Sequence, residues 1–276
     1  MLKKNLLANY LGYAWSAVMG FAFIPYYISY LGMENYGLIG FFVIIQGALT
    51  LLDMGMTPSL GRESAKYVGG GLDSNEFRLL IRTYEIITLI IISLALMIVF
   101  FLSSDIVKYW MNLESISPEV AQRAVVLMGV LFGLRFGEGI YRSILIGIQE
   151  HVSFNLANAL VATLRWGGVV VVFEYYSATV LIYFWWNILI SITAVVIFAF
   201  LVYRVSGMPK INTGISLNLI ARNWRFTGGM ALITLSAFIL VNIDKLIVSN
   251  KMSMREYGMY IIIVTLTSAL ALIGAY

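Results

Sequence analysis

The chain consists of long apolar segments, each about 20 to 28 residues in length, separated by shorter polar stretches. As a helix, such a segment crosses a hydrocarbon core of roughly 30 Å, whereas the strands of a membrane barrel are shorter and alternate in polarity. Hydrophobic residues make up 61% of the chain and charged residues only 12%, which leaves too little polar surface for a soluble domain. The sequence therefore predicts an all-α fold, a polytopic membrane helical bundle.

The positions of these segments predict eight spanning helices. They cover residues 5–31, 36–55, 79–102, 120–148, 152–176, 178–203, 226–249 and 257–276. Residues 57–78 and 103–119 are predicted to be polar loops. Residues 215–224 alternate apolar with polar residues in a way that favours a short helix in the membrane interface.

Basic residues in the predicted loops are distributed unevenly between the two sides of the membrane. The side of the N-terminus carries Lys3, Lys4, Arg62, Lys66, Arg78, Arg82, Arg204, Lys210, Arg222 and Arg225. The opposite side carries Lys108, Arg123, Lys251 and Arg255. Because cytoplasmic loops are enriched in Lys and Arg, the N-terminus is predicted to be cytoplasmic.

Residues 120–176 form a predicted helical hairpin in which both arms carry arginine. Arg135 and Arg165 each lie 15 residues from Glu150 in the turn, so at about 1.5 Å per residue both reach a depth of roughly 22 Å. That depth is near the bilayer midplane. On the first arm Arg135, Glu138 and Arg142 share one helical face, so Glu138 is within reach of either arginine.

The candidate substrate-binding residues are Arg135, Glu138, Arg142, Arg165 and Asn158. Asn158 is included because it is level with Arg142 on the second arm. An arginine inside the membrane costs about 2.5 to 3.5 kcal/mol on insertion scales, so three of them indicate a function. Their positive excess favours an anionic substrate. A structural role is the alternative, in which Glu138 pairs with Arg135 or Arg142, helix carbonyls hold another arginine, and Arg142 extends toward the cytoplasmic side.

Two aspartates are weaker candidates, for ion coupling. Asp53 lies at the inner end of the second predicted helix, where capping or loop pairing is the alternative role. Asp244 lies deeper and has Lys245 beside it, so a structural pair and a coupling site are equally open. The chain has no cysteine, which excludes thiolate chemistry, and its single histidine, His151, lies in the hairpin turn.

A short internal repeat relates the two ends of the chain. Residues 33–37 (MENYG) recur as residues 254–258 (MREYG), and the same offset matches Lys4 with Arg225 ahead of a helix. Because the offset covers six helices, an even number, the copies are predicted to be parallel repeats with a substrate path between them. We therefore predict a six-helix lobe at residues 1–210 and the first two helices of a second lobe at residues 211–276. The apolar end of the chain indicates a fragment.

Several short motifs occur in an order that matches a known family. They are residues 30–37 (YLGMENYG), 52–55 (LDMG) followed by Arg62, 242–245 (NIDK) and 256–258 (EYG). With these motifs the chain resembles the polysaccharide-type flippases that export O-antigen units, within the multidrug, oligosaccharidyl-lipid and polysaccharide exporter superfamily. The resemblance implies a two-lobed carrier with a cationic cavity, which flips undecaprenyl-diphosphate-linked oligosaccharide by alternating access for lipopolysaccharide and other polysaccharide biosynthesis.

The resemblance also implies a place in the bacterial cytoplasmic (inner) membrane and a proton or sodium gradient as the driving force. The expected partners are the polyprenyl-diphosphate-linked glycan, the lipid bilayer and other polysaccharide-assembly membrane proteins; no nucleic acid and no cofactor is expected. Two alternatives remain open. An ion-coupled multidrug exporter of the same superfamily calls for acidic and aromatic cavity walls, and a membrane-embedded glycan polymerase, which would be an enzyme, calls for catalytic carboxylates or histidines.

Overall fold

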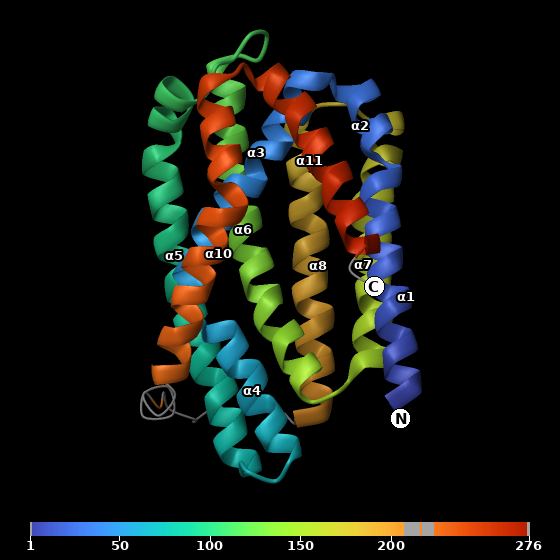
Figure 1. Cartoon of the computed structure of the whole chain (residues 1–276), viewed down its shortest axis with the longest axis vertical. Helices are drawn as coiled ribbons and strands as arrows, with labels where there is room; N and C mark the ends of the chain where they lie inside the picture. The colour runs from blue at the N-terminus through green and yellow to red at the C-terminus, as the bar shows by residue number, and fades with distance from the viewer. Residues whose placement is uncertain (1, 207–215, 217–223, 275–276) are drawn as a thin grey trace.

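The computed structural model describes residues 2–206, 216 and 224–274, and it is a bundle of long helices that run alternately up and down (Figure 1). The helices are α1 (Leu2–Ala22), α2 (Ile24–Leu31), α3 (Met33–Thr50), α4 (Met56–Val68), α5 (Ser74–Asp105), α6 (Pro118–Gly147), α7 (His151–Tyr175), α8 (Val180–Ser206), α10 (Trp224–Lys251) and α11 (Met254–Gly274). We call the two ends of the bundle the α2 end and the α4 end.

Six stretches in the described part of the chain are long and apolar enough to cross a membrane. They are Met33–Asp53, Ser74–Trp110, Pro118–Gly147, His151–Tyr175, Val180–Ser206 and Thr227–Lys251. α1 and α11 run beside them (Figure 1). In the described ranges the structure has no strand, only an isolated bridge between Asn112 and Ser253. The predicted fold class, an all-α polytopic membrane bundle, is confirmed.

The first predicted helix is divided into two. α1 ends at Ala22 and α2 begins at Ile24, with Pro25 in the first turn of α2. Proline has no backbone N–H and its ring clashes with the preceding turn, so a continuous helix is interrupted at this point.

Residues 57–78 are not a polar loop, and that prediction was wrong. Residues 56–68 form the amphipathic helix α4, which lies at the end of the bundle opposite α2 (Figure 1). The side chain of Glu63 is buried there. Its Oε1 atom lies 3.1 Å from Arg62 Nη2 and 2.6 Å from Lys66 Nζ. This helix was missed because its apolar residues occupy one face only and it lacks the apolar length of a spanning segment.

Residues 103–119 are also more helical than predicted. α5 continues to Asp105, and residues Ile106–Trp110 add a π-helical turn before the chain reaches α6. The side chain of Ser117 caps the start of α6 by accepting from the N–H of Val120. The predicted interface helix at 215–224 and the lobe boundary at 210 lie outside the described residues, apart from Ser216 and the first residue of α10.

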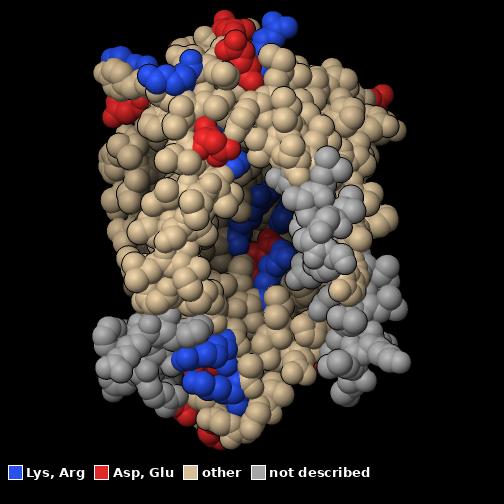
Figure 2. All heavy atoms as spheres, in the orientation of Figure 1, with Lys and Arg blue, Asp and Glu red and all other residues tan. Residues whose placement is uncertain are grey.

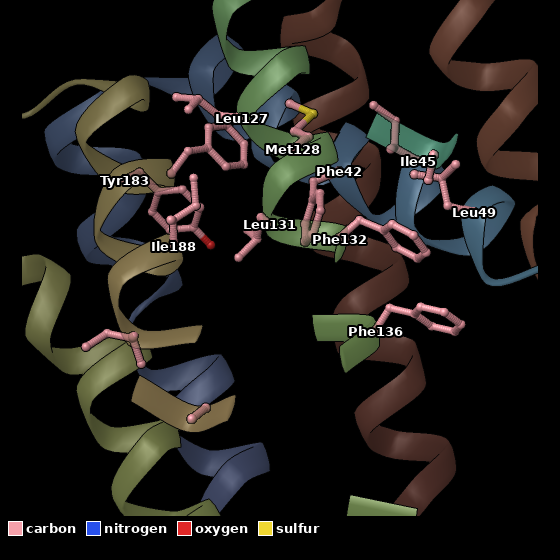
Figure 3. Packing of buried hydrophobic residues seen from close by; sticks show 14 of the residues in the cluster. Phe42, Ile45, Leu49, Leu127, Met128, Leu131, Phe132, Phe136, Tyr183 and Ile188 are labelled. Carbon is pink, nitrogen blue, oxygen red and sulfur yellow. The ribbon is translucent and has the colours of Figure 1, made fainter. Parts of the chain in front are cut away.

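α6 is the centre of the bundle, because it contacts α3, α4, α5, α7 and α8. Its apolar side chains pack against those of α3 and α8, as Figure 3 shows for part of the core. Leu131 and Phe132 of α6 are buried here, together with Phe42 of α3 and Phe184 of α8. Because helices surround α6 on several sides, polar side chains that α6 carries are buried among its neighbours.

The two copies of the internal repeat contact each other at the α2 end. Residues 33–37 form the first turn of α3 and residues 254–258 the first turn of α11, and both helices run from that end toward the α4 end (Figure 1). A second connection lies beside them, since Asn112 donates to the carbonyls of Asn250 and Met252. α10 and α11 are thus attached to the rest of the bundle at this end.

Candidate functional site

Glu138 of α6 connects two arginines inside the bundle. Its Oε1 atom accepts from Arg142 of α6 at 2.9 Å, and its Oε2 atom accepts from Arg165 of α7 at 3.0 Å. Among the described residues, the pair of Glu138 with Arg165 is the ion pair that joins two spanning helices. The sequence pattern left Arg135 or Arg142 open as the partner of Glu138; Arg142 is confirmed, and Arg165 is a further partner that the pattern did not predict.

Arg135 of α6 has neutral partners among the described residues. Its guanidinium donates to Gln46 Oε1 of α3 at 3.1 Å and to Asn187 Oδ1 of α8 at 3.4 Å. It also lies over the ring of Phe42, with 4.9 Å from its central carbon to the ring centroid. Arg135 is therefore held in place by side-chain oxygens and an aromatic face, not by helix carbonyls.

Arg135 and Arg165 lie against the same face of α8. Arg135 donates to Asn187, and Arg165 donates to Ser191 Oγ at 3.4 Å. Asn187 and Ser191 are four residues apart, which places them one helical turn, about 6 Å, from each other. The partners of the two arginines thus differ in depth by about one turn of α8, and the equal depth of the arginines themselves stays a prediction.

Arg135, Glu138, Arg142 and Arg165, which we call the arginine cluster, carry three positive charges and one negative charge. Each of Arg135 and Arg165 also has a buried Nε atom without a hydrogen-bond partner among the described residues. A buried donor that is left unsatisfied costs about 1 to 3 kcal/mol. The cluster is therefore incomplete in charge and in hydrogen bonding, and an anion with several acceptor oxygens would satisfy both deficits.

The face shown in Figure 2 is hollowed near its middle, and basic and acidic side chains are visible inside the hollow. α10 and α11 lie on either side of the opening, with α6 and α8 behind them (Figure 1). α6 and α7 carry the arginine cluster and α8 carries its partners Asn187 and Ser191, so a ligand that enters between α10 and α11 approaches these helices directly.

The two residues of α8 that accept hydrogen bonds from the arginine cluster could have been found in the sequence. Asn187 and Ser191 are polar residues one turn apart within the apolar segment 180–206, which is a pattern typical of a buried polar face. The pattern alone does not say which helix that face meets. The packing of α8 against α6 supplies this answer.

Asn158, the fifth predicted binding residue, has its hydrogen-bond partner on α1 and not in the arginine cluster. Its amide donates to Ser16 Oγ of α1 at 3.0 Å, and its side chain is buried in the contact between α1 and α7. The structure therefore brings together four of the five predicted residues and places Asn158 at a helix–helix contact.

Asp53 lies at the start of α4, where capping was one of its two predicted roles. Its Oδ1 atom accepts from the backbone N–H of Thr57 at 3.0 Å and from the Thr57 hydroxyl at 2.7 Å. Its side chain is buried beneath that turn. This geometry is that of a side chain that satisfies free N–H groups at a helix start.

Asp244 of α10 is the more accessible of the two aspartates. Its side chain is 48% exposed, it accepts from the hydroxyl of Tyr260 on α11, and one carboxylate oxygen lies 3.5 Å from Lys245 Nζ. Lys245 itself is buried and donates to the carbonyl of Val241. Asp244 thus connects α10 with α11 through a group that can accept a proton or a cation.

Residues 2–276 match the protein-family model described as polysaccharide biosynthesis protein. Comparison with curated proteins and with solved structures gives no match. The matched region includes every spanning helix and the whole arginine cluster.

Proposed function

The chain belongs to the polysaccharide biosynthesis protein family, and from this membership we propose that it is a flippase for undecaprenyl-diphosphate-linked oligosaccharide. It would move this lipid-linked glycan across the bacterial cytoplasmic membrane by alternating access, with its N-terminus in the cytoplasm. O-antigen units of lipopolysaccharide are the substrate class that we favour. In this function the chain is a transporter, not an enzyme, and its partners are the glycan lipid, the bilayer and other membrane proteins of polysaccharide assembly.

The observation that carries the proposal is the unbalanced charge of the arginine cluster. Glu138 neutralises one of the charges on Arg142 and Arg165, and Arg135 is next to neutral groups. Like charges in a medium of low dielectric constant repel one another strongly unless an anion is close by. A diphosphate carries the negative charges and the acceptor oxygens that this arrangement lacks.

Arginine also suits a diphosphate better than other cations do. Its planar guanidinium donates two parallel hydrogen bonds to one phosphate, whereas the ammonium of lysine acts as a point charge. Arg135 and Arg165 lie one turn apart along α8, so each is positioned to bind one of two linked phosphates. A cationic drug would be repelled here, which is why we favour the glycan lipid over the multidrug exporter alternative.

We propose that a proton or sodium gradient drives the transport, with Asp244 as the coupling group. Asp244 joins α10 to α11 through Tyr260 and is accessible from outside the bundle. Protonation or cation binding at Asp244 would change this connection. Asp53 serves less well, because its oxygens are committed to Thr57.

The proposal is tested by replacing Arg135 and Arg165, singly, by Ala and by Lys. The replacements are expressed in a strain that lacks its own flippase, and surface glycan is measured together with the amount of protein in the membrane. We expect Ala to abolish surface glycan and Lys to reduce it, with membrane levels unchanged.

Arg123→Ala is the matched control, since Arg123 is an exposed arginine on the same helix, three turns from Arg135. It should leave surface glycan at the level of the parent. Normal surface glycan in both Ala variants would overturn the proposal. Loss of the protein from the membrane would instead assign the arginines a structural role.

A further inference from the structure

A cavity of about 430 Å³ lies on the outer side of the bundle, where α5 and α8 flank α6. It is separate from the arginine cluster, because the residues of α6 that line it occupy another helical face. Gly133, Gly137 and Tyr141 follow one another at four-residue spacing and line the cavity, whereas Arg135 and Glu138 point to the interior.

Gly137 keeps the floor of the cavity open. A methyl group on Gly133 would lie 2.7 Å from Ile92 of α5, so Gly133 is required for close packing of the two helices. A methyl group on Gly137 would meet only the tip of Ile92, at 3.9 Å, which is ordinary contact. Gly137 is thus not needed for helix packing, and the missing side chain is what leaves the space.

The two ends of the cavity differ in polarity. Toward the α4 end, Glu85 of α5 accepts from Tyr141 at 2.7 Å, from the Tyr203 hydroxyl, and from Arg82 at 3.3 Å. Further along α5 and α8 the lining is apolar, with Ile92 and Val195. From Arg82 to Ile92 the cavity extends over ten residues of α5, about 15 Å at 1.5 Å per residue.

The side chains at and beside the opening of the cavity are apolar and exposed. Leu89 of α5, which lines it, is 61% exposed, and Phe200 of α8 is 62% exposed. Both are within spanning stretches, where exposed apolar side chains face the acyl chains of the bilayer. An occupant therefore enters sideways from the lipid.

The charge at the polar end fits a phosphate. Glu85 is turned inward, with its carboxylate committed to two tyrosine hydroxyls and to Arg82, and its side chain is 10% exposed. Arg82 is 47% exposed, so its guanidinium is the charged group that the cavity presents outward. A guanidinium with free donors at the edge of the membrane binds a phosphate group through charge-assisted hydrogen bonds.

We propose that this cavity is a binding site for a membrane phospholipid, with one acyl chain between α5, α6 and α8 and the headgroup phosphate on Arg82. The site does not depend on the proposed transport function, because it lies outside the arginine cluster and takes a lipid of the surrounding leaflet. A bound phospholipid would fill the space between two helices and hold them on α6.

The test uses the 276-residue chain in phosphatidylethanolamine vesicles that contain a phosphatidylglycerol probe with a diazirine in the middle of one acyl chain. After illumination, labelled peptides are identified by mass spectrometry. We expect labelling to concentrate on α5, α6 and α8 around Ile92 and Val195. Gly137→Leu, which fills the cavity, should reduce that labelling about tenfold, the effect of displacing two methylene groups.

Gly139→Leu is the matched control, since a methyl group on Gly139 would meet nothing within 4 Å and Gly139 does not line the cavity. It should label like the parent. A second pair of variants tests the headgroup: Arg82→Gln should reduce labelling about tenfold, whereas Arg78→Gln, one turn earlier on α5, should not.

Two results would overturn the proposal. One is equal labelling of all lipid-facing helices in the parent, and the other is unchanged labelling in both Gly137→Leu and Arg82→Gln. If Gly137→Leu does not fold, as judged by its elution in detergent, the comparison of Arg82→Gln with Arg78→Gln decides alone.

Discussion

Gly37 of α3 and Gly258 of α11 pack directly on each other's helices. A methyl group on Gly37 would lie 1.9 Å from the carbonyl oxygen of Met254, and a methyl group on Gly258 would lie 2.5 Å from the carbonyl oxygen of Met33. The two glycines are equivalent positions of the internal repeat, as are the two methionines. The contact is therefore reciprocal, as expected where two parallel copies meet along a shared axis.

A side chain at either glycine should disrupt this contact. Because the obstructing atoms belong to the backbone, Gly37→Val or Gly258→Val should destabilise the chain by about 1 to 3 kcal/mol or more, as over-packed sites do. Thermal unfolding in detergent, followed by circular dichroism, measures the loss. Gly139→Val is the control in an open position, and equal melting of Gly37→Val and this control would contradict the reciprocal contact.

The partner of Glu138 is a second test of the structure. A double-mutant cycle between Glu138→Gln and Arg165→Gln should give a coupling energy of about 1 to 3 kcal/mol, as for groups in direct contact. The cycle between Glu138→Gln and Arg135→Gln should give a much smaller coupling, since Arg135 is held by Gln46 and Asn187. Denaturation in detergent supplies the free energies. The opposite ranking would assign Arg135, and not Arg165, as a partner of Glu138.

The sequence predicted what depends on length and on spacing along one helix. The apolar segments predicted the helices, and six of the eight predicted spans are long and apolar enough to cross a membrane in the described part of the chain, whereas α1 and α11 are helical but outside that set. The spacing of Arg135, Glu138 and Arg142 placed Glu138 within reach of Arg142, with which it pairs. Arg82 and Glu85, three residues apart on α5, form an ion pair at 3.3 Å, as the spacing along one helix allows. These features are local, so the geometry of a single helix or hairpin determines them.

What the sequence did not predict depends on which helices are neighbours. Asn158 was placed near Arg142 by depth alone, but α7 presents it to Ser16 of α1. Gln46 on α3 and Tyr203 on α8 lie far along the chain from the residues that they contact. Rotation of a helix about its axis is set by packing with several partners, and that information is spread over the whole bundle.

The orientation of the bundle follows from the asymmetry of basic residues and is tested by single cysteines. Gly69 follows α4 at one end, and Glu114 follows the π-helical turn at the other; both are exposed. Gly69→Cys should react with a membrane-impermeant maleimide only after the inner side is opened, and Glu114→Cys should react in intact cells. The reverse pattern would show that the N-terminus is not cytoplasmic.

The two aspartates should respond differently to removal of their charge. Asp53 accepts hydrogen bonds from Thr57, and asparagine retains an acceptor oxygen in that position. Asp53→Asn should therefore keep surface glycan near the parental level. Asp53→Ala removes the acceptor and should lower the free energy of unfolding by about 1 kcal/mol. Asp244→Asn removes the carboxylate that we propose for ion coupling, so surface glycan should fall while the amount of protein in the membrane stays constant. Both are measured in the strain used for the arginine variants. Loss of surface glycan in Asp53→Asn but not in Asp244→Asn would transfer the coupling role to Asp53.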